Sequence, residues 1–492
     1  MNTHEEHTTS TDKTTGKGRA MGKDRAMGKD RLRRLPAVGA VIDASRRRGG
    51  RCAEADGELL AYLTRRRLDT LRRAVIAGAP MPDHELELAG VVEHVATALG
   101  RFDDDSSTCR VINATGIILH SGLGRAVLPR PVTDRLAQAR GYVLLEVDRE
   151  AAARRKRDAF VEELLCHLTG AEAALVVNNN AAATILLLAT LAAGKEVIVS
   201  RSQMVEIGGS YRLPDVMEAS GCQLREVGTT NKSYARDYEA AVGEASGALM
   251  LVHTSNYKLV GFTEHVEIEE MVQIGQRVGL PVIHDLGSGC LLSPEALGFD
   301  DEPPVQASVK AGADVICFSG DKLIGGVQAG IIVGKRSWVE KVRKHPLARA
   351  FRIDKLACIG LETTLKLYLE PSKLRERLPV LRMIRERPET LARRARSLAT
   401  RLRRALGDRA TVGTVATTSE AGSGALPAVG LPTTCVTVRP TEGSVDRLAR
   451  ALRQRPVPIF ARVRDGAVWL DPRTLQTGEA AEIVAALDDL LA

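Results

Sequence analysis

The sequence contains no run of 18 or more apolar residues, and its first residues form no hydrophobic segment of the kind found in secretory signals. We therefore expect a cytoplasmic protein that makes no contact with a membrane. Its eight cysteines are scattered without any C-x-x-C pair, which argues against a zinc site or a disulfide framework and favours a reducing compartment. We expect no metal site. At 492 residues, the chain is long enough for two or three domains with a large core.

Acidic residues are few near the start of the chain, where basic residues gather. Residues 11–34 hold nine Lys or Arg and three Asp, so they carry six of the eight net positive charges. A repeat of six residues (GKGRAM, GKDRAM, GKDR) begins at residue 16. Its glycine content and its lack of an apolar face predict a disordered basic tail over residues 1–30. Such a tail could bind phosphates without sequence preference, although it is more often dispensable.

Residues 31–105 have the pattern of a small helical domain. Apolar residues recur near helical spacing between Leu60 and Val75, with arginines between them, and a second helix is predicted over residues 83–99. The arginine-rich face fits either an ordinary solvated helix or a surface for RNA. Aromatic residues make up only 3% of the chain, so RNA recognition would depend on shape and phosphates more than on base stacking. The apolar positions are Leu60, Leu63, Leu68, Leu71 and Val75, and the arginines are Arg65, Arg66, Arg67, Arg72 and Arg73.

Lys322 lies between an apolar strand candidate at residues 313–318 and a glycine-rich turn, with a second apolar run at residues 329–333. Desolvation in such a place lowers the pKa of an amine and frees its lone pair to attack a carbonyl. Most lysines are solvated surface charges, so this run alone is a weak signal.

Asp285 ends another apolar strand candidate, residues 280–284, and opens a Gly-Ser-Gly turn. At the carboxyl end of a parallel strand, an aspartate points into the ligand crevice of an open α/β sheet. There it can hold a pyridine nitrogen protonated, which makes the ring an electron sink. The alternative is a helix N-cap or a turn aspartate.

Three consecutive asparagines, Asn178, Asn179 and Asn180, follow a third strand candidate and precede a helical run. The amides of such a turn and the N-terminus of the helix make a phosphate cradle. A phosphate anchor, a ring acid and a Schiff-base lysine then follow one another along alternating strands and helices. That combination indicates a fold-type-I pyridoxal phosphate (PLP) enzyme.

Alternation of strands with helices predicts an α/β fold with a mostly parallel sheet, covered on both sides. Residues 106–388 are expected to form the large PLP-binding catalytic domain. An arginine-rich helix and further strands predict a smaller C-terminal α/β domain over residues 389–492.

Longer motifs make the resemblance more specific. They are NNNAAA at residues 178–183, VEIGG at 205–209, EVGTTN at 226–231, VHTSNY at 252–257, DLGSG at 285–289, FSGDK at 318–322, GSGALP at 422–427 and RDGAVWLD at 464–471. From about residue 110 to the C-terminus, the chain resembles the bacterial selenocysteine synthases, which are L-seryl-tRNA(Sec) selenium transferases.

The resemblance implies that L-seryl-tRNA(Sec) is converted to L-selenocysteinyl-tRNA(Sec) through PLP-dependent β-elimination of the serine hydroxyl and addition of selenium from selenophosphate. Lys322 would carry the cofactor and then take the serine Cα proton, while Asp285 would keep the ring protonated. Ser319 could hydrogen-bond the cofactor phosphate. Residues 31–105 would bind the tRNA. The resemblance also implies a homo-oligomer, a decamer built from dimers.

The same resemblance assigns three arginines to the selenophosphate anion: Arg125 in HSGLGR, and Arg349 and Arg352 in HPLARAFR. Guanidinium groups suit bidentate phosphate binding. A spacing of three would put Arg349 and Arg352 on one face of a helix, which also fits an ordinary surface ion-pair face. His253 could touch the cofactor, whereas His284 adjoins Asp285 and is expected to pack on the other face of the sheet.

The chain departs from the family pattern at Gly122, at Ser202-Gln203 and over residues 147–158, which are rich in arginine and helix-prone. These changes weaken what the resemblance implies about the binding of selenophosphate and tRNA, but they leave the prediction of PLP binding unchanged. Two alternatives stay open. A PLP lyase or transferase acting on a free small amino acid would not need the basic helical domain. A noncatalytic tRNA-binding relative would be expected to lose Lys322 or Asp285.

Overall fold

The computed structural model describes residues 30–100, 102, 108–209, 211–300, 302–422 and 424–492. The chain forms two compact units, Met1–Arg110 and Val111–Ala492, and each is described by itself. The predicted basic tail lies outside the described residues except for its last position. Within the ranges just given, every helix is too short or too polar to cross a lipid bilayer.

The first unit is helical. It contains α2 (Val38–Arg48), α3 (Arg51–Glu54), α4 (Gly57–Ile76), the 3-10 turn η1 (Asp83–Leu86) and α5 (Leu88–Gly100). The predicted apolar stripe of α4 is buried against α2 and α5, while Arg65, Arg66, Arg72 and Arg73 are exposed. The single helix predicted over residues 83–99 is instead a 3-10 turn followed by α5, because Glu87 has an extended backbone that interrupts it.

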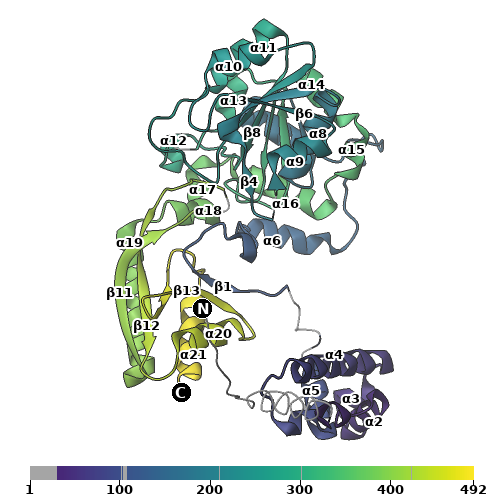
Figure 1. The fold of residues 1–492 in the computed structure, drawn as a ribbon, viewed down its shortest axis with the longest axis vertical. Helices are drawn as coiled ribbons and strands as arrows, with labels where there is room; N and C mark the ends of the chain where they lie inside the picture. The colour runs from purple at the N-terminus through teal and green to yellow at the C-terminus, as the bar shows by residue number, and fades with distance from the viewer. Residues whose placement is uncertain (1–29, 101, 103–107, 210, 301, 423) are drawn as a thin grey trace, which may run out of the picture. The chain divides into compact units, whose positions relative to one another are not determined.

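A sheet of seven strands organises the second unit (Figure 1). In spatial order they are β2 (Ala173–Val177), β10 (Gly330–Gly334), β9 (Val315–Ser319), β8 (Val282–Gly287), β7 (Ser246–Val252), β3 (Glu196–Ser200) and β6 (Gln223–Val227). The five strands from β9 to β6 are parallel, and only β10 runs antiparallel to its neighbours. The predicted mostly parallel sheet is therefore present.

Both faces of this sheet are covered. Alternate side chains of each strand enter two different apolar clusters, as Ile283 and Val315 do on one face and Val282 and Ile316 do on the other. Burial on both faces explains why these strands are continuous apolar runs. The helices of this part of the chain are α6 (Arg130–Ala137), α7 (Ala159–Thr169), α8 (Asn180–Leu191), α9 (Leu213–Ala219), α10 (Ala235–Ala241), α11 (Ile268–Val278), α12 (Pro294–Leu297), α13 (Val305–Ala311), α14 (Arg336–Arg343), α15 (Pro346–Ala350), α16 (Lys355–Leu367), α17 (Pro371–Arg377) and α18 (Pro379–Ile384).

A second sheet is built mainly by the C-terminal part of the chain. Its spatial order is β1 (Ile112–Ala114), β13 (Ile459–Arg464), β14 (Ala467–Leu470), β12 (Leu431–Pro440) and β11 (Ala410–Ser419). The helices α19 (Pro388–Leu406), α20 (Val445–Arg453) and α21 (Glu479–Leu490) share its apolar core. Strand β1 pairs parallel to β13, so residues 112–114 belong to this second sheet. The boundaries predicted from the sequence had placed them in the large domain.

Short elements complete the second unit. The strands β4 (Glu206–Ile207) and β5 (Tyr211–Arg212) form a two-stranded ribbon next to the carboxyl ends of the large sheet's strands. The remaining 3-10 turns are η2 (Ser121–Leu123), η3 (Gln138–Arg140), η4 (Arg201–Gln203) and η5 (Gly407–Arg409).

Candidate active site

A cavity of about 290 Å³ lies where β7, β8 and β9 end and α8 begins. This is the position at which open α/β sheets bind ligands. Residues distant in the sequence meet here. The cavity is lined by Arg125, Asn179, Asn180, Ala181, Val205, Ile207, Gly208, Tyr211, Val252, His253, Ser255, Asp285, Gly287, Ser319, Asp321, Lys322 and Gln328. Six of the nine predicted site residues are among them.

Lys322 follows β9 and is 95% buried, with 5% of its surface exposed. Burial lowers the pKa of its amine, and the positive charge of Arg125 lowers it further. The carboxylates of Asp285, Asp321 and Glu302 oppose this shift without cancelling it. The Lys322 amine is therefore deprotonated more readily than a surface lysine, as a nucleophile or a base requires.

Asp285 lies on β8 and is also buried. One of its oxygens accepts hydrogen bonds from Asn180 Nδ2 at 2.9 Å and from the Gly287 amide at 3.0 Å, and the other accepts from Thr184 Oγ1 at 3.0 Å. Three donors from two elements fix the orientation of this carboxylate. Thr184 lies one helical turn after Asn180 on α8, so both side chains face the sheet. Thr184 was not predicted from the sequence, although its spacing from Asn180 was a usable signal.

The three asparagines separate in the structure. Asn179 is the N-cap of α8, where its side chain accepts a hydrogen bond from the Ala182 amide at 2.9 Å. Asn180 contacts Asp285, and its Oδ1 is buried without a partner among the described residues. Asn178 is exposed and does not line the cavity; its amide donates to the Phe351 carbonyl. The cradle at this helix start is thus formed without the Asn178 side chain.

Arg125 reaches the cavity from the loop after η2. Its Nη1 lies 2.8 Å from Asp321 Oδ2, and Asp321 immediately precedes Lys322. The Arg125 backbone is left-handed, with φ of 61°, a conformation that places strain on any residue with a Cβ. Ser319, the last residue of β9, is buried and also lines the cavity.

Arg349 and Arg352 do not line this cavity. The prediction that they share a helix face is wrong, because α15 ends at Ala350 and Arg352 lies beyond its C-cap. Arg352 instead pairs with Glu146 at 3.1 Å, and its backbone bridges to Val177 at the end of β2.

The segment 147–158 is not helical either. Val147 bridges antiparallel to Arg154, and Asp148 accepts hydrogen bonds from the amides of Glu150 and Ala151. These bonds from an aspartate to the backbone stabilise a turn in competition with a helix.

Two histidines behave differently. His284 is buried, its Nδ1 lies 2.9 Å from Ser308 Oγ, and burial lowers its pKa to about 3. It packs away from the cavity lining, as predicted. His253 lines the cavity, and its Nε2 lies 3.5 Å from the buried carboxylate of Glu302.

Tyr211 was not foreseen from the sequence. It lies on β5 and lines the cavity, and its pKa is raised by burial and by the charge of Asp285. It therefore stays a neutral phenol. A two-residue strand gives no periodic pattern, so no signal in the sequence pointed to it.

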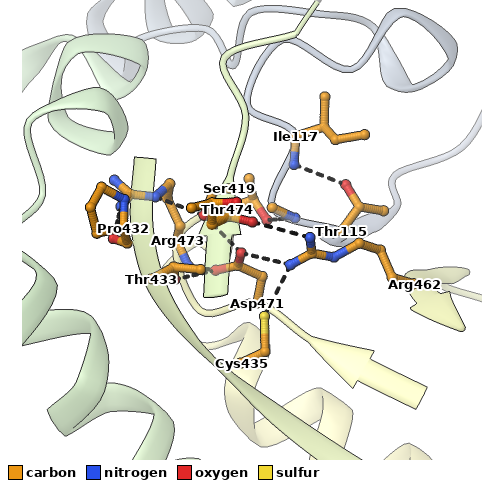
Figure 2. A network of polar contacts seen from close by, with 12 residues as sticks. Thr115, Ile117, Ser419, Pro432, Thr433, Cys435, Arg462, Asp471, Arg473 and Thr474 are labelled. Atoms are coloured by element: carbon orange, nitrogen blue, oxygen red, sulfur yellow. Dashed lines mark hydrogen bonds and ion pairs between the residues drawn. The ribbon is translucent and has the colours of Figure 1, made fainter. Parts of the chain in front are cut away.

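The C-terminal sheet brings two segments to this cavity, and Figure 2 shows the polar network at their base. Asp471, fully buried, accepts hydrogen bonds from Ser419 and Thr433 and pairs with Arg462. From there, residues 117–119 run beside residues 420–421, joined by backbone hydrogen bonds. The first segment continues to Arg125. The second continues to Gly424, where a Cβ would lie 3.3 Å from Lys322 Nζ.

Comparison with known proteins gives concordant results. Residues 111–476 match the family model described as SelA, L-seryl-tRNA selenium transferase. An L-seryl-tRNA(Sec) selenium transferase from Moorella thermoacetica is 47% identical over 457 residues, which are 93% of this chain and 96% of the relative. One from Nitratidesulfovibrio vulgaris is 49% identical over 383 residues, covering 78% of this chain and 82% of the relative.

A solved structure shares the fold. The D-glucosaminate-6-phosphate ammonia-lyase structure superposes with a TM-score of 0.53 at 22% identity, covering 78% of this chain and 95% of the other.

Proposed function

Because the chain belongs to the L-seryl-tRNA selenium transferase family, we propose that it converts L-seryl-tRNA(Sec) to L-selenocysteinyl-tRNA(Sec). One observation in the structure carries this proposal most strongly. A buried lysine with a lowered pKa, Lys322, shares one cavity with a carboxylate held by three donors, Asp285.

The residues of the cavity fit PLP as the cofactor. Lys322 would attach it, and Asp285 would face its ring nitrogen. The start of α8, with Ala181 in the cavity wall, and Ser319 would hold its phosphate. The buried Asn180 Oδ1, which has no partner among the described residues, offers a further acceptor for a bound group. When bound, PLP supplies an electron sink for the charge that develops at the serine Cα.

The protein's own groups supply the proton transfers. Lys322 Nζ would take the Cα proton of the seryl group, for which its lowered pKa suits it. Asp285 would keep a positive charge at the ring nitrogen. The serine hydroxyl would take up a proton and leave the β-carbon as water. Selenium from selenophosphate would bond to that carbon, and its P–Se bond would be hydrolysed with release of phosphate. Neutral Tyr211 and the His253–Glu302 pair border the cavity in which this occurs.

Selenophosphate is proposed as the selenium donor, with Arg125, Arg349 and Arg352 as its ligands. The support is strongest for Arg125, which lines the cavity. Arg352 pairs with Glu146 in the structure, so donor binding through Arg352 requires it to leave that partner. We keep all three as the proposed set.

The wider assignments rest on the family. Residues 31–105 are proposed to bind tRNA(Sec), residues 106–388 to form the PLP domain and residues 389–492 the small domain, with β1 contributed across that boundary. A homo-oligomer, namely a decamer built from dimers, and a cytoplasmic location are proposed with them.

The test compares seryl-tRNA(Sec) with free L-serine, each incubated with the purified PLP-loaded protein. The group esterified to the tRNA is released by hydrolysis and identified by mass spectrometry. We expect loss of the serine hydroxyl only from the tRNA-bound amino acid. Conversion of free serine alone would instead assign the protein to small amino-acid chemistry.

A further inference from the structure

A second cavity, of about 490 Å³, lies between α18, the middle of α19 and the segment that joins β14 to α21. Five arginines and one glutamate are among the residues that line it. The arginines are Arg382, Arg393, Arg394, Arg401 and Arg473. The positive charges gathered in this cavity repel one another, and a bound anion would offset that repulsion.

Three of these arginines have protein partners. Arg473 is 2% exposed and is fixed by Ser419 Oγ and by the carbonyls of Met383 and Pro432. Arg394 pairs with Glu386 at 3.0 Å, and Arg382 donates to Gln476 Oε1 at 2.7 Å. These contacts give the cavity a rigid wall.

The other two arginines, Arg393 and Arg401, are exposed on α19 and make no hydrogen bond or ion pair within the part of the chain that the structure describes. With Ser397 they form an i, i+4, i+8 series, so all three lie on one side of the helix. Eight residues of helix place Arg393 and Arg401 about 12 Å apart along the axis. Two unpaired guanidiniums at that separation suit two separate phosphates of one chain better than one small anion.

We propose that this cavity and the adjoining face of α19 bind backbone phosphates of the tRNA substrate, as a contact surface separate from the helical first unit. Guanidinium forks pair with phosphate oxygens in bidentate geometry, and the Ser397 hydroxyl adds a neutral donor. The helix itself is held by its buried side, which packs on β11 and β12 (Figure 1). The exposed side is thus free for a ligand without any change of fold.

The proposal rests on the proposed function for the identity of the RNA, but it is tested by binding rather than by turnover. Full-length wild type, the R393Q/R401Q variant and a matched control, R447Q/R450Q, are titrated with fluorescent tRNA(Sec) over a range of KCl concentrations. Arg447 and Arg450 are exposed arginines on α20 that do not line the cavity. The two changes in each variant remove the same amount of exposed positive charge.

We expect R393Q/R401Q to weaken tRNA binding about tenfold or more at 0.1 M salt and to reduce the log–log salt slope by roughly one to two, since each lost phosphate contact contributes about 0.7 to 0.9. The control should keep the wild-type slope. Equal losses in both variants would show a general charge effect and overturn the proposal, as would no loss in R393Q/R401Q.

A second arm separates the two sources of phosphate. Inorganic phosphate is added to wild type and R393Q/R401Q, and the melting temperature is measured. If phosphate stabilises wild type alone while tRNA affinity is the same in both proteins, the cavity binds a small anion and the proposal is wrong. If R393Q/R401Q loses tRNA affinity relative to wild type, yet wild type forms no selenocysteine, the proposed function fails while this surface stands.

Discussion

Arg125 and Asp321 form an ion pair at the edge of the active-site cavity, with Nη1 of the arginine 2.8 Å from Oδ2 of the aspartate. The two charges have opposite effects on the adjacent Lys322. Arg125 lowers the pKa of its amine, and Asp321 raises it. The loop that leaves η2 therefore tunes the lysine that we propose as the cofactor's attachment point.

This relationship predicts opposite pH shifts for two variants. In R125Q the repelling charge is lost, so the Lys322 pKa rises and attachment of PLP to the apoprotein requires a higher pH. In D321N the pKa falls further, and attachment extends to lower pH. The measurement is the rate at which the visible cofactor band appears after PLP is added, recorded against pH. Shifts in the same direction for both variants would contradict the electrostatic account.

Lys322→Ala should abolish covalent attachment of PLP. The control is Lys341→Ala, which removes an exposed lysine on α14. Borohydride reduction followed by peptide mass spectrometry locates the modified residue. The assignment predicts a modified peptide containing residue 322 in wild type and in the control, and none in the variant. A modified lysine at another position would show that PLP is attached there and would contradict the assignment of Lys322.

His284 makes stability depend on pH. Its pKa is about 3 in the folded protein, against 6.5 for an unperturbed histidine, because burial disfavours the charged ring. Between those values the unfolded chain binds more protons than the folded one, so the free energy of unfolding falls as the pH is lowered from 6.5 towards 3. The loss could reach about 5 kcal/mol.

Urea unfolding of wild type and His284→Gln at several pH values measures this term. The variant should show a shallower decline below pH 6.5 than wild type. Parallel declines in the two proteins would mean that other groups dominate the acid sensitivity.

Gly116 lies against Asp471 and Thr474, two residues of the network in Figure 2, and its amide donates to Thr474 Oγ1. Its φ is +79°, and a Cβ there would meet Asp471 Oδ2 at 2.1 Å. Gly116→Ala should therefore lower the free energy of unfolding by about 2 kcal/mol or more, from backbone strain and displacement of the buried carboxylate. Gly243 has no neighbour within 4 Å of such a Cβ, so Gly243→Ala should stay within about 0.5 kcal/mol. Chemical denaturation compares the two.

The large sheet and the two central site residues could be predicted because their physical signals are local. Strands buried on both faces are apolar runs, and residues near their C-terminal ends, such as Asp285 and Ser319, must lie at the carboxyl edge of the sheet. Lys322 could be predicted for the same reason, because it lies three residues after the end of the apolar strand β9. The motifs at residues 178–183 and 318–322 contributed to identifying the family.

Other parts depend on tertiary contacts that leave no local pattern. β1 is three residues long and acquires its place only by pairing with β13. Arg352 follows the end of a five-residue helix, and its position is set by Glu146 and by β2. Tyr211 lies on a two-residue strand and enters the site through tertiary contacts. Spacing rules could not resolve these positions.

The central claim is that this cavity makes selenocysteine on tRNA. We would incubate the PLP-loaded protein with seryl-tRNA(Sec) and selenophosphate, hydrolyse the ester and identify the amino acid by mass spectrometry, with Lys322→Ala run in parallel. The account predicts selenocysteine from wild type and unchanged serine from the variant. Unchanged serine from a wild-type protein that holds PLP and binds the tRNA would contradict it.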